Sequence, residues 1–158
     1  MSTSAQFINL AGLAAVVLYA VLGVLTILVW NPSAAMPALE LSEIYRQVEA
    51  ASETMGLGVV AAFGVMGIGL GLTAAVVFWR RKTDPPSLIL AVYLTLLALA
   101  GPAYFWASFP FGMGLADTFA IGGGDHSRVG YLLVGASGLA FLALLPVLWR
   151  FVYRPPAG

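Results

Sequence analysis

"FWRRKTDPP", residues 78–86, decides how this chain is built. Three adjacent cations, Arg80, Arg81 and Lys82, are followed by two prolines, and long apolar segments flank them on both sides. The chain has only seven basic residues, so these three are a large share of them. A short basic segment between two uncharged segments is typical of a turn that joins two membrane-spanning helices on the cytoplasmic side.

The composition of the whole chain agrees with a membrane protein. Of the 158 residues, 61% are hydrophobic and 9% are charged, whereas soluble domains carry about 25% charged residues. A soluble fold of this size could not hide so much apolar surface from water. The net charge is zero, so nothing in the composition points to nucleic acid as a partner. The absence of cysteine excludes disulfides and thiolate metal sites.

Four segments are long and apolar enough to cross a bilayer, which takes about 20 residues. None of the four contains a charged residue, and they cover residues 8–30, 55–79, 88–106 and 129–149. Only helices satisfy all backbone hydrogen bonds within one lipid-exposed segment. The sequence therefore predicts an all-α integral membrane protein, a four-helix transmembrane bundle formed as one domain over residues 1–158. Its predicted loops are 31–54, 80–87 and 107–128.

The charges of the connecting segments predict the orientation. The segment between the second and third spans sums to +2, and so does the segment after the fourth span. The other two connections sum to −3 and −1. Because Lys and Arg accumulate on the cytoplasmic side, we expect both termini inside and both longer loops outside. We expect the plasma (inner) membrane of a bacterium as the location.

The N-terminal segment lacks the positive region that begins a signal peptide. We therefore expect the first helix to be retained. Cleavage near "PSAAM", residues 32–36, is the alternative.

Aromatic residues mark the predicted membrane boundaries. Trp and Tyr prefer the interface because each has an apolar body and a polar group. We expect one set at the outer boundary, namely Trp30, Tyr104, Phe105, Trp106 and Tyr131, and another at the inner boundary, namely Trp79, Trp149 and Tyr153.

Small residues predict the faces through which the helices pack. Gly64, Gly67 and Gly71 recur on one face of the second span, and Ala136 and Ala140 recur on the fourth. In lipid, helices associate where small residues let their backbones approach closely. We expect these residues to form contacts inside the bundle, with a dimer face as the weaker alternative.

Prolines interrupt the third and fourth spans. Pro102 and Pro146 each remove one amide and crowd the carbonyl group four residues earlier, that of Ala98 or Leu142. We expect kinks at both positions.

The first outer loop contains an amphipathic pattern. Leu41, Ile44, Tyr45 and Val48 recur at helical spacing, which predicts a short helix. A solvated charged face is the simplest interpretation of its opposite side. The alternative is an acidic docking face for a basic partner, formed by Glu40, Glu43 and Glu49.

The second outer loop is unusually apolar. Phe109 and Phe111 lie outside the predicted spans, so we expect them to seek the headgroup layer, the mouth of the bundle or a neighbouring subunit.

Reactive groups are scarce in the predicted membrane region. No Asp, Glu, Lys, Arg or His lies inside a span, and His126 is the only histidine of the chain. Ion-coupled transporters generally need such groups. We expect no metal site, no cofactor and no enzymatic activity. The hydroxyl groups in the spans are expected to form hydrogen bonds between helices, and they belong to Tyr19, Thr73, Tyr93, Thr95 and Ser137.

These features favour a non-catalytic accessory or structural subunit of a larger membrane complex, for example in respiratory or photosynthetic electron transport. Its expected partners are the lipid bilayer and other membrane subunits, with a homo-oligomer as a further possibility. The first alternative is a small homo-oligomeric transporter or channel for an apolar or neutral solute. A membrane enzyme or cofactor-binding protein is the third hypothesis.

The orientation can be tested at Lys82, the single lysine of the chain. An amine-reactive reagent that does not cross membranes should leave Lys82 unmodified in intact cells and should modify it after the membrane is opened. Peptide mass mapping measures both states. Modification of Lys82 in intact cells would contradict the predicted topology.

Overall fold

The computed structural model describes residues 2–153, and this part of the chain is helical without a strand. The elements are α1 (Thr3–Leu25), the π-helix η1 (Thr26–Trp30), α2 (Asn31–Ala35), α3 (Leu41–Ala50), α4 (Leu57–Arg81), α5 (Pro86–Phe119) and α6 (Arg128–Tyr153). Four helical segments are long and apolar enough to span a membrane: α1 with its extension, α4, α5 and α6. The prediction of an all-α membrane protein with four spans is confirmed to this extent.

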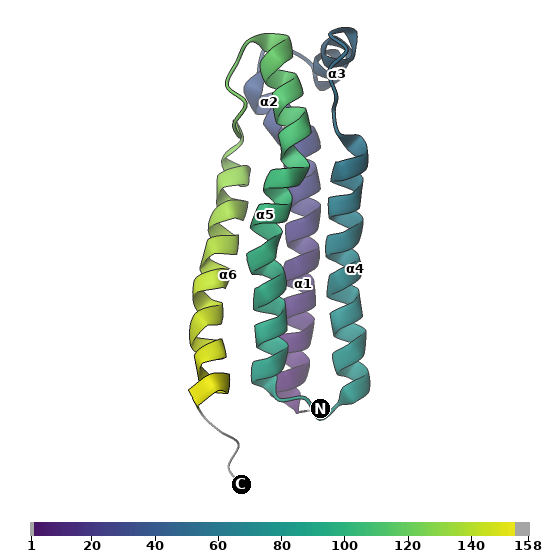
Figure 1. The fold of residues 1–158 in the computed structure, drawn as a ribbon. Coiled ribbons are helices and arrows are strands. Elements are labelled where there is room, and N and C mark those ends of the chain that lie inside the picture. Colours follow the sequence, from purple (N-terminus) through teal and green to yellow (C-terminus); the bar gives the residue numbers. More distant parts are fainter. Residues whose placement is uncertain (1, 154–158) are drawn as a thin grey trace.

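Long helices that follow one another in the chain run antiparallel, so α1 and α5 point in one direction and α4 and α6 in the other (Figure 1). The start of α1, the α4–α5 turn and the end of α6 lie at one end of the bundle, whereas α2, α3 and residues 120–127 lie at the other. Helix α1 packs against both α4 and α5, and α6 packs mainly against α5. The segment 154–158, which carries Arg154 and which we predict to be cytoplasmic, lies outside the described residues.

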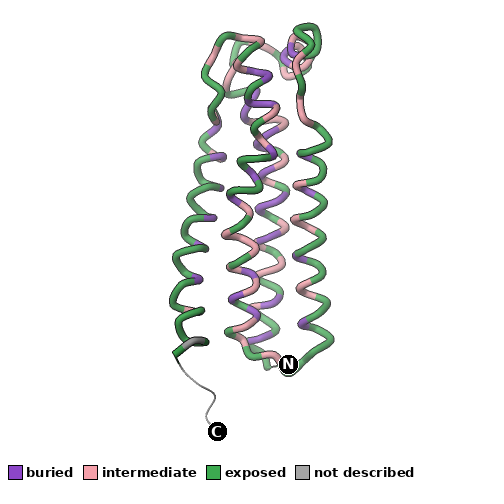
Figure 2. Tube along the Cα trace, viewed as in Figure 1, coloured by how far each residue is buried: buried purple, intermediate pink, exposed green. Residues whose placement is uncertain are grey.

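Burial is concentrated along α1 and α5 (Figure 2). Helix α6 instead shows an exposed surface over most of its length, as does the outer side of α4. These exposed surfaces carry large apolar side chains such as Val65, Leu132 and Leu139. In a bilayer such side chains face lipid, which is as apolar as they are.

Two helices extend beyond the predicted boundaries. The first span continues through η1 and α2 to Ala35, and α5 continues past Trp106 to Phe119. The expectation that residues 107–128 form a loop is therefore wrong for their first half. The extension of α5 is helical because Phe111 and Leu115, one turn apart, are buried in the same apolar cluster as Ile44 and Val48.

Three glycines of α4, Gly64, Gly67 and Gly71, pack against α1. A Cβ atom added to them would lie 3.0 to 3.1 Å from a side-chain atom of α1. The facing pairs are Gly64 with Val24, Gly67 with Ala20 and Gly71 with Val16. Each glycine thus lets the two helices pack more closely than any larger residue would allow.

This contact can be tested with two valine substitutions in the same helix. Gly67→Val should lower the free energy of unfolding by about 1–3 kcal/mol, because the new side chain overlaps Ala20. Gly69→Val is the control, since no atom lies within 4 Å of a Cβ at Gly69. Denaturant unfolding in detergent micelles measures both. Equal losses would show that valine itself, and not the α1 contact, causes the effect.

Candidate functional site

Asn9 joins three helices at the end of the bundle where α1 begins. Its side chain is fully buried. Its amide nitrogen donates to the carbonyl oxygen of Ala75 in α4 at 3.2 Å, and its amide oxygen accepts from the hydroxyl of Tyr93 in α5 at 2.8 Å. Gly12, about one turn further along α1, leaves the room that the Tyr93 ring occupies. Asn9 was not predicted from the sequence, because it carries neither the charge nor the hydroxyl group by which the other polar residues of the spans stand out.

Ser137 of α6 stabilises α5 at Pro102. Pro102 has no N–H group, so the carbonyl of Ala98 loses its helical donor. The Ser137 hydroxyl donates to that carbonyl at 2.7 Å and accepts from the amide of Gly101 at 3.1 Å. Gly101 has no side chain, and a Cβ there would overlap the Ser137 hydroxyl. The Ser137 hydroxyl thus bonds to α5 twice at the turn that Pro102 interrupts, once as donor and once as acceptor.

Tyr45 of α3 provides a second case of the same kind. Pro32 removes the amide that would otherwise bond to the carbonyl of Leu28 in an α-helix. The Tyr45 hydroxyl donates to this carbonyl at 2.7 Å. The Tyr45 ring also packs edge-on against Phe111 of α5, with 5.2 Å between the ring centroids. Helix α3 is therefore fastened to both η1 and α5.

The five hydroxyl groups expected to join helices do not all do so. The prediction of hydrogen bonds between helices is confirmed for Tyr93 and Ser137. It is wrong for Thr73 and Thr95, whose hydroxyls donate to the carbonyl four residues earlier in their own helix. The hydroxyl oxygen of Tyr19 is fully enclosed and has no hydrogen-bond partner among the described residues.

Polar side chains also tie the α5–α6 connection to the bundle. The amide oxygen of Asn31 accepts from the backbone amides of His126 and Ser127 at 2.6 and 3.4 Å, just before α6 begins. The hydroxyl of Tyr104 donates to the carboxylate of Asp125 at 3.1 Å. Burial raises the pKa of Asp125, although the hydrogen bond from Tyr104 and the nearby His126 act in the opposite direction.

These residues do not form a metal site. Among residues 2–153, no group of three or more His, Asp or Glu side chains is placed to hold a metal ion. The imidazole Nε2 of His126 lies 2.9 Å from the carbonyl oxygen of Gly122, within the same connection. The polar groups at this end therefore hold the connection in place through hydrogen bonds.

The acidic residues of α3 differ in their surroundings. Glu40 and Glu49 are exposed. Glu43 accepts hydrogen bonds from Arg46 at 2.8 Å and from Gln47 at 2.6 Å. The hydrogen bond from Arg46 contributes most to lowering the pKa of Glu43 to about 2, and that from Gln47 adds to it. Glu40 and Glu49 are thus the carboxylates of this set left free for another molecule in the described part of the chain.

Phe109 and Phe111, which we expect at the headgroup layer, the mouth of the bundle or a neighbouring subunit, differ in exposure. Phe109 is 49% exposed, but Phe111 is buried at 1% exposure against Tyr45. Phe111 therefore belongs to the core between α3 and α5 and offers no surface to a partner. The sequence could not distinguish them, because it did not show that α5 continues through this region.

The small residues of α6 face two sides. Ala140 is buried on the side that packs against α5, together with Leu133 and Leu144. Ala136 is exposed instead. The predicted Ala136–Ala140 face is therefore split, since Ser137, and not Ala136, lies in the contact with α5.

Gly135 and Gly138 are exposed on the surface of α6 that does not pack against α5. No atom lies within 4 Å of a Cβ built on either residue. Their spacing of three residues places them on one side of the helix. They leave a shallow, small-residue surface where the backbone of another helix can approach closely.

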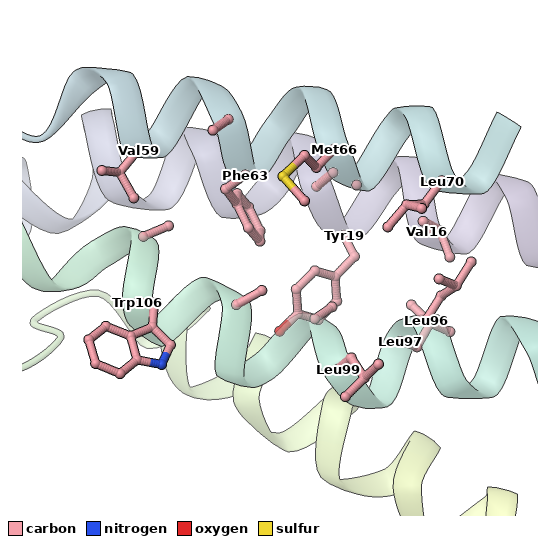
Figure 3. A pocket seen from close by; sticks show the side chains of 16 residues that line it. Val16, Tyr19, Val59, Phe63, Met66, Leu70, Leu96, Leu97, Leu99 and Trp106 are labelled. Atoms are coloured by element: carbon pink, nitrogen blue, oxygen red, sulfur yellow. The ribbon is translucent and has the colours of Figure 1, made fainter. Parts of the chain in front are cut away.

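A groove lies between α4 and α5, with α1 as its floor (Figure 3). Its volume is about 330 Å³. The α4 wall includes Val59, Phe63, Met66 and Leu70, the α5 wall includes Leu96, Leu99, Ala103 and Trp106, and the floor is Val16, Tyr19 and Ala20. Met66, Leu99 and Trp106 are all more than 60% exposed, so the groove opens sideways to the surroundings of the bundle.

Comparisons of the chain with protein families, with curated proteins and with solved structures found no match.

The role of Ser137 can be tested with a double-mutant cycle. Ser137→Ala should lower the free energy of unfolding by about 0.6–2 kcal/mol, because it removes the hydroxyl that donates to the Ala98 carbonyl and accepts from the Gly101 amide. In the Pro102→Ala background the loss should be smaller, since this substitution restores a backbone amide that can donate to the Ala98 carbonyl. Unfolding in detergent micelles measures all four chains.

Ser108→Ala is the control for this cycle. The Ser108 hydroxyl donates to the Phe105 carbonyl within α5 and contacts no other helix through that bond. Its replacement should change stability by much less than Ser137→Ala. An equal effect of Ser137→Ala with and without Pro102 would contradict the proposed link between the serine and the proline.

Proposed function

We propose that this protein is a non-catalytic accessory subunit that assembles with other membrane proteins in a larger complex, of which a respiratory or photosynthetic complex is an example. The observation that carries the proposal is the outward-facing pair of Gly135 and Gly138 on α6. Glycine in a membrane helix is favoured where another helix packs closely against it. Within residues 2–153 no helix covers this pair, so a second protein would supply that helix.

The use of the buried polar groups supports this proposal. Asn9, Tyr93 and Ser137 all make hydrogen bonds between helices of the bundle. Their donors and acceptors therefore serve the stability of the fold. A bundle whose small-residue surface on α6 has no neighbour among residues 2–153 suits a role in assembly better than one in catalysis.

We assign the end of the bundle that carries Arg80, Arg81 and Lys82 to the cytoplasm, with both termini on that side. The support is the positive charge of the segment between the second and third spans and of the segment after the fourth span. The α3 end then faces outward from the plasma membrane. On this side Glu40 and Glu49 offer a second, acidic contact for a basic region of the partner.

Extraction from the native membrane tests the proposal. In a mild detergent, the chain should co-purify at a fixed ratio with other membrane subunits. The double substitution Gly135→Leu and Gly138→Leu should reduce the amount of retained partner about tenfold, because two bulky side chains keep the partner helix away from the α6 backbone. Quantitative mass spectrometry of the purified complex measures the ratio.

A matched control exists on α4. Gly58 and Gly69 are also open, with no atom within 4 Å of an added Cβ, so replacing both with leucine makes the same chemical change elsewhere. This control should retain the partner. A uniform homo-oligomer without other chains would contradict the proposal and favour the transporter hypothesis. Equal retention by both leucine variants would exclude the α6 surface as the contact.

A further inference from the structure

We propose that the groove between α4 and α5 binds one acyl chain of a phospholipid from the leaflet on the α3 side. This inference goes beyond the proposed function, because it concerns a lipid and not a protein partner. It rests on three properties of the groove: its depth in the bundle, its width and the chemistry of its lining.

The groove covers half of the membrane thickness. Trp106 lies 20 positions after Pro86, the first residue of α5, which corresponds to about 30 Å of helix, the thickness of the hydrocarbon layer. The α5 wall runs from Leu96 to Trp106, a distance of about 15 Å. It therefore extends from the middle of the bilayer to the boundary at Trp106, as one leaflet of lipid chains does.

The width of the groove fits a single hydrocarbon chain. A volume of about 330 Å³ over about 15 Å gives a mean cross-section of about 22 Å². Carbon atoms in contact lie about 3.5–4.0 Å apart, so one extended chain fills a cross-section on the order of 12–16 Å². A helix with its side chains is about 10–12 Å wide and needs several times this area. A whole helix is therefore too wide to lie inside the groove.

The lining changes from apolar to amphipathic along the groove. At the end in the middle of the bilayer lie Leu70 and Leu96, and Tyr19 lies across the floor (Figure 3). At the other end the indole of Trp106 stands beside the opening, with its nitrogen available to donate a hydrogen bond (Figure 3). An indole at this depth meets the ester and phosphate oxygens of a lipid. The headgroup is thus expected at Trp106 and the methyl end at Leu70.

The groove persists because the backbones around it are held apart. Phe63 of α4 and Tyr104 of α5 pack edge-on at 6.3 Å, and Phe63 also fills the space at Gly23 of α1. Closing the groove would require these aromatic rings to move. An empty groove would leave its lining atoms without contact partners, and the lateral opening allows a lipid chain to supply them.

The test counts the phospholipid held by the full-length chain. The protein is reconstituted into phosphatidylcholine vesicles, extracted again with a mild detergent that removes loosely associated lipid, and examined by native mass spectrometry. Ala103→Trp fills the groove from the α5 wall and Ala62→Trp fills it from the α4 wall. Ala143→Trp, on the exposed surface of α6, is the matched control.

We expect one phosphatidylcholine per chain in the unmodified protein and in Ala143→Trp, and about tenfold lower occupancy in both groove variants. If one groove variant fails to fold, the variant on the opposite wall decides. No bound lipid in the unmodified protein, or equal occupancy in all four chains, would overturn the proposal. So would a quinone or a polypeptide in place of phospholipid when the protein is taken from its native membrane.

Discussion

The structure depends on one constraint, which is that a backbone group inside lipid must find its hydrogen bond within the protein. Regular helix meets this constraint everywhere except at proline. At two prolines a hydroxyl group from another helix takes the place of the missing amide: Ser137 bonds to the Ala98 carbonyl before Pro102, and Tyr45 bonds to the Leu28 carbonyl before Pro32. Each repair also fixes the position of a neighbouring element, α6 in the first case and α3 in the second.

The same constraint explains where polar side chains are placed in this bundle. Asn9 has both its amide donor and its amide acceptor in use, one toward α4 and one toward α5, because a free amide would be costly in an apolar interior. Glycines allow close contact along the α1–α4 face. Together these contacts set α1 as the central helix that holds α4 and α5, and the groove lies where these two helices are kept apart by the rings of Phe63 and Tyr104.

The two ends of the molecule are built differently. One end is a short basic turn between α4 and α5, while the other carries α3 and the connection to α6, which are fastened by Tyr45, Asn31 and Asp125. Within residues 2–153, the glycine surface of α6 has no neighbour, and it is the feature on which the proposed assembly role rests. The lipid groove and the α6 surface lie on different helices, so both can be occupied at once.

The sequence by itself determined the helical class and the four spans, because hydrophobic length is a local property that each segment shows alone. It also marked Ser137 and Tyr93 as hydroxyls that join helices. Only the tertiary structure placed Asn9 at a three-helix contact, buried Phe111 beneath α3, split Ala136 from Ala140 and formed the groove. Those features require the relative rotation of helices that lie far apart in the chain. In lipid that rotation is set by close packing and by hydrogen bonds between helices, and not by a hydrophobic face that the sequence pattern would reveal.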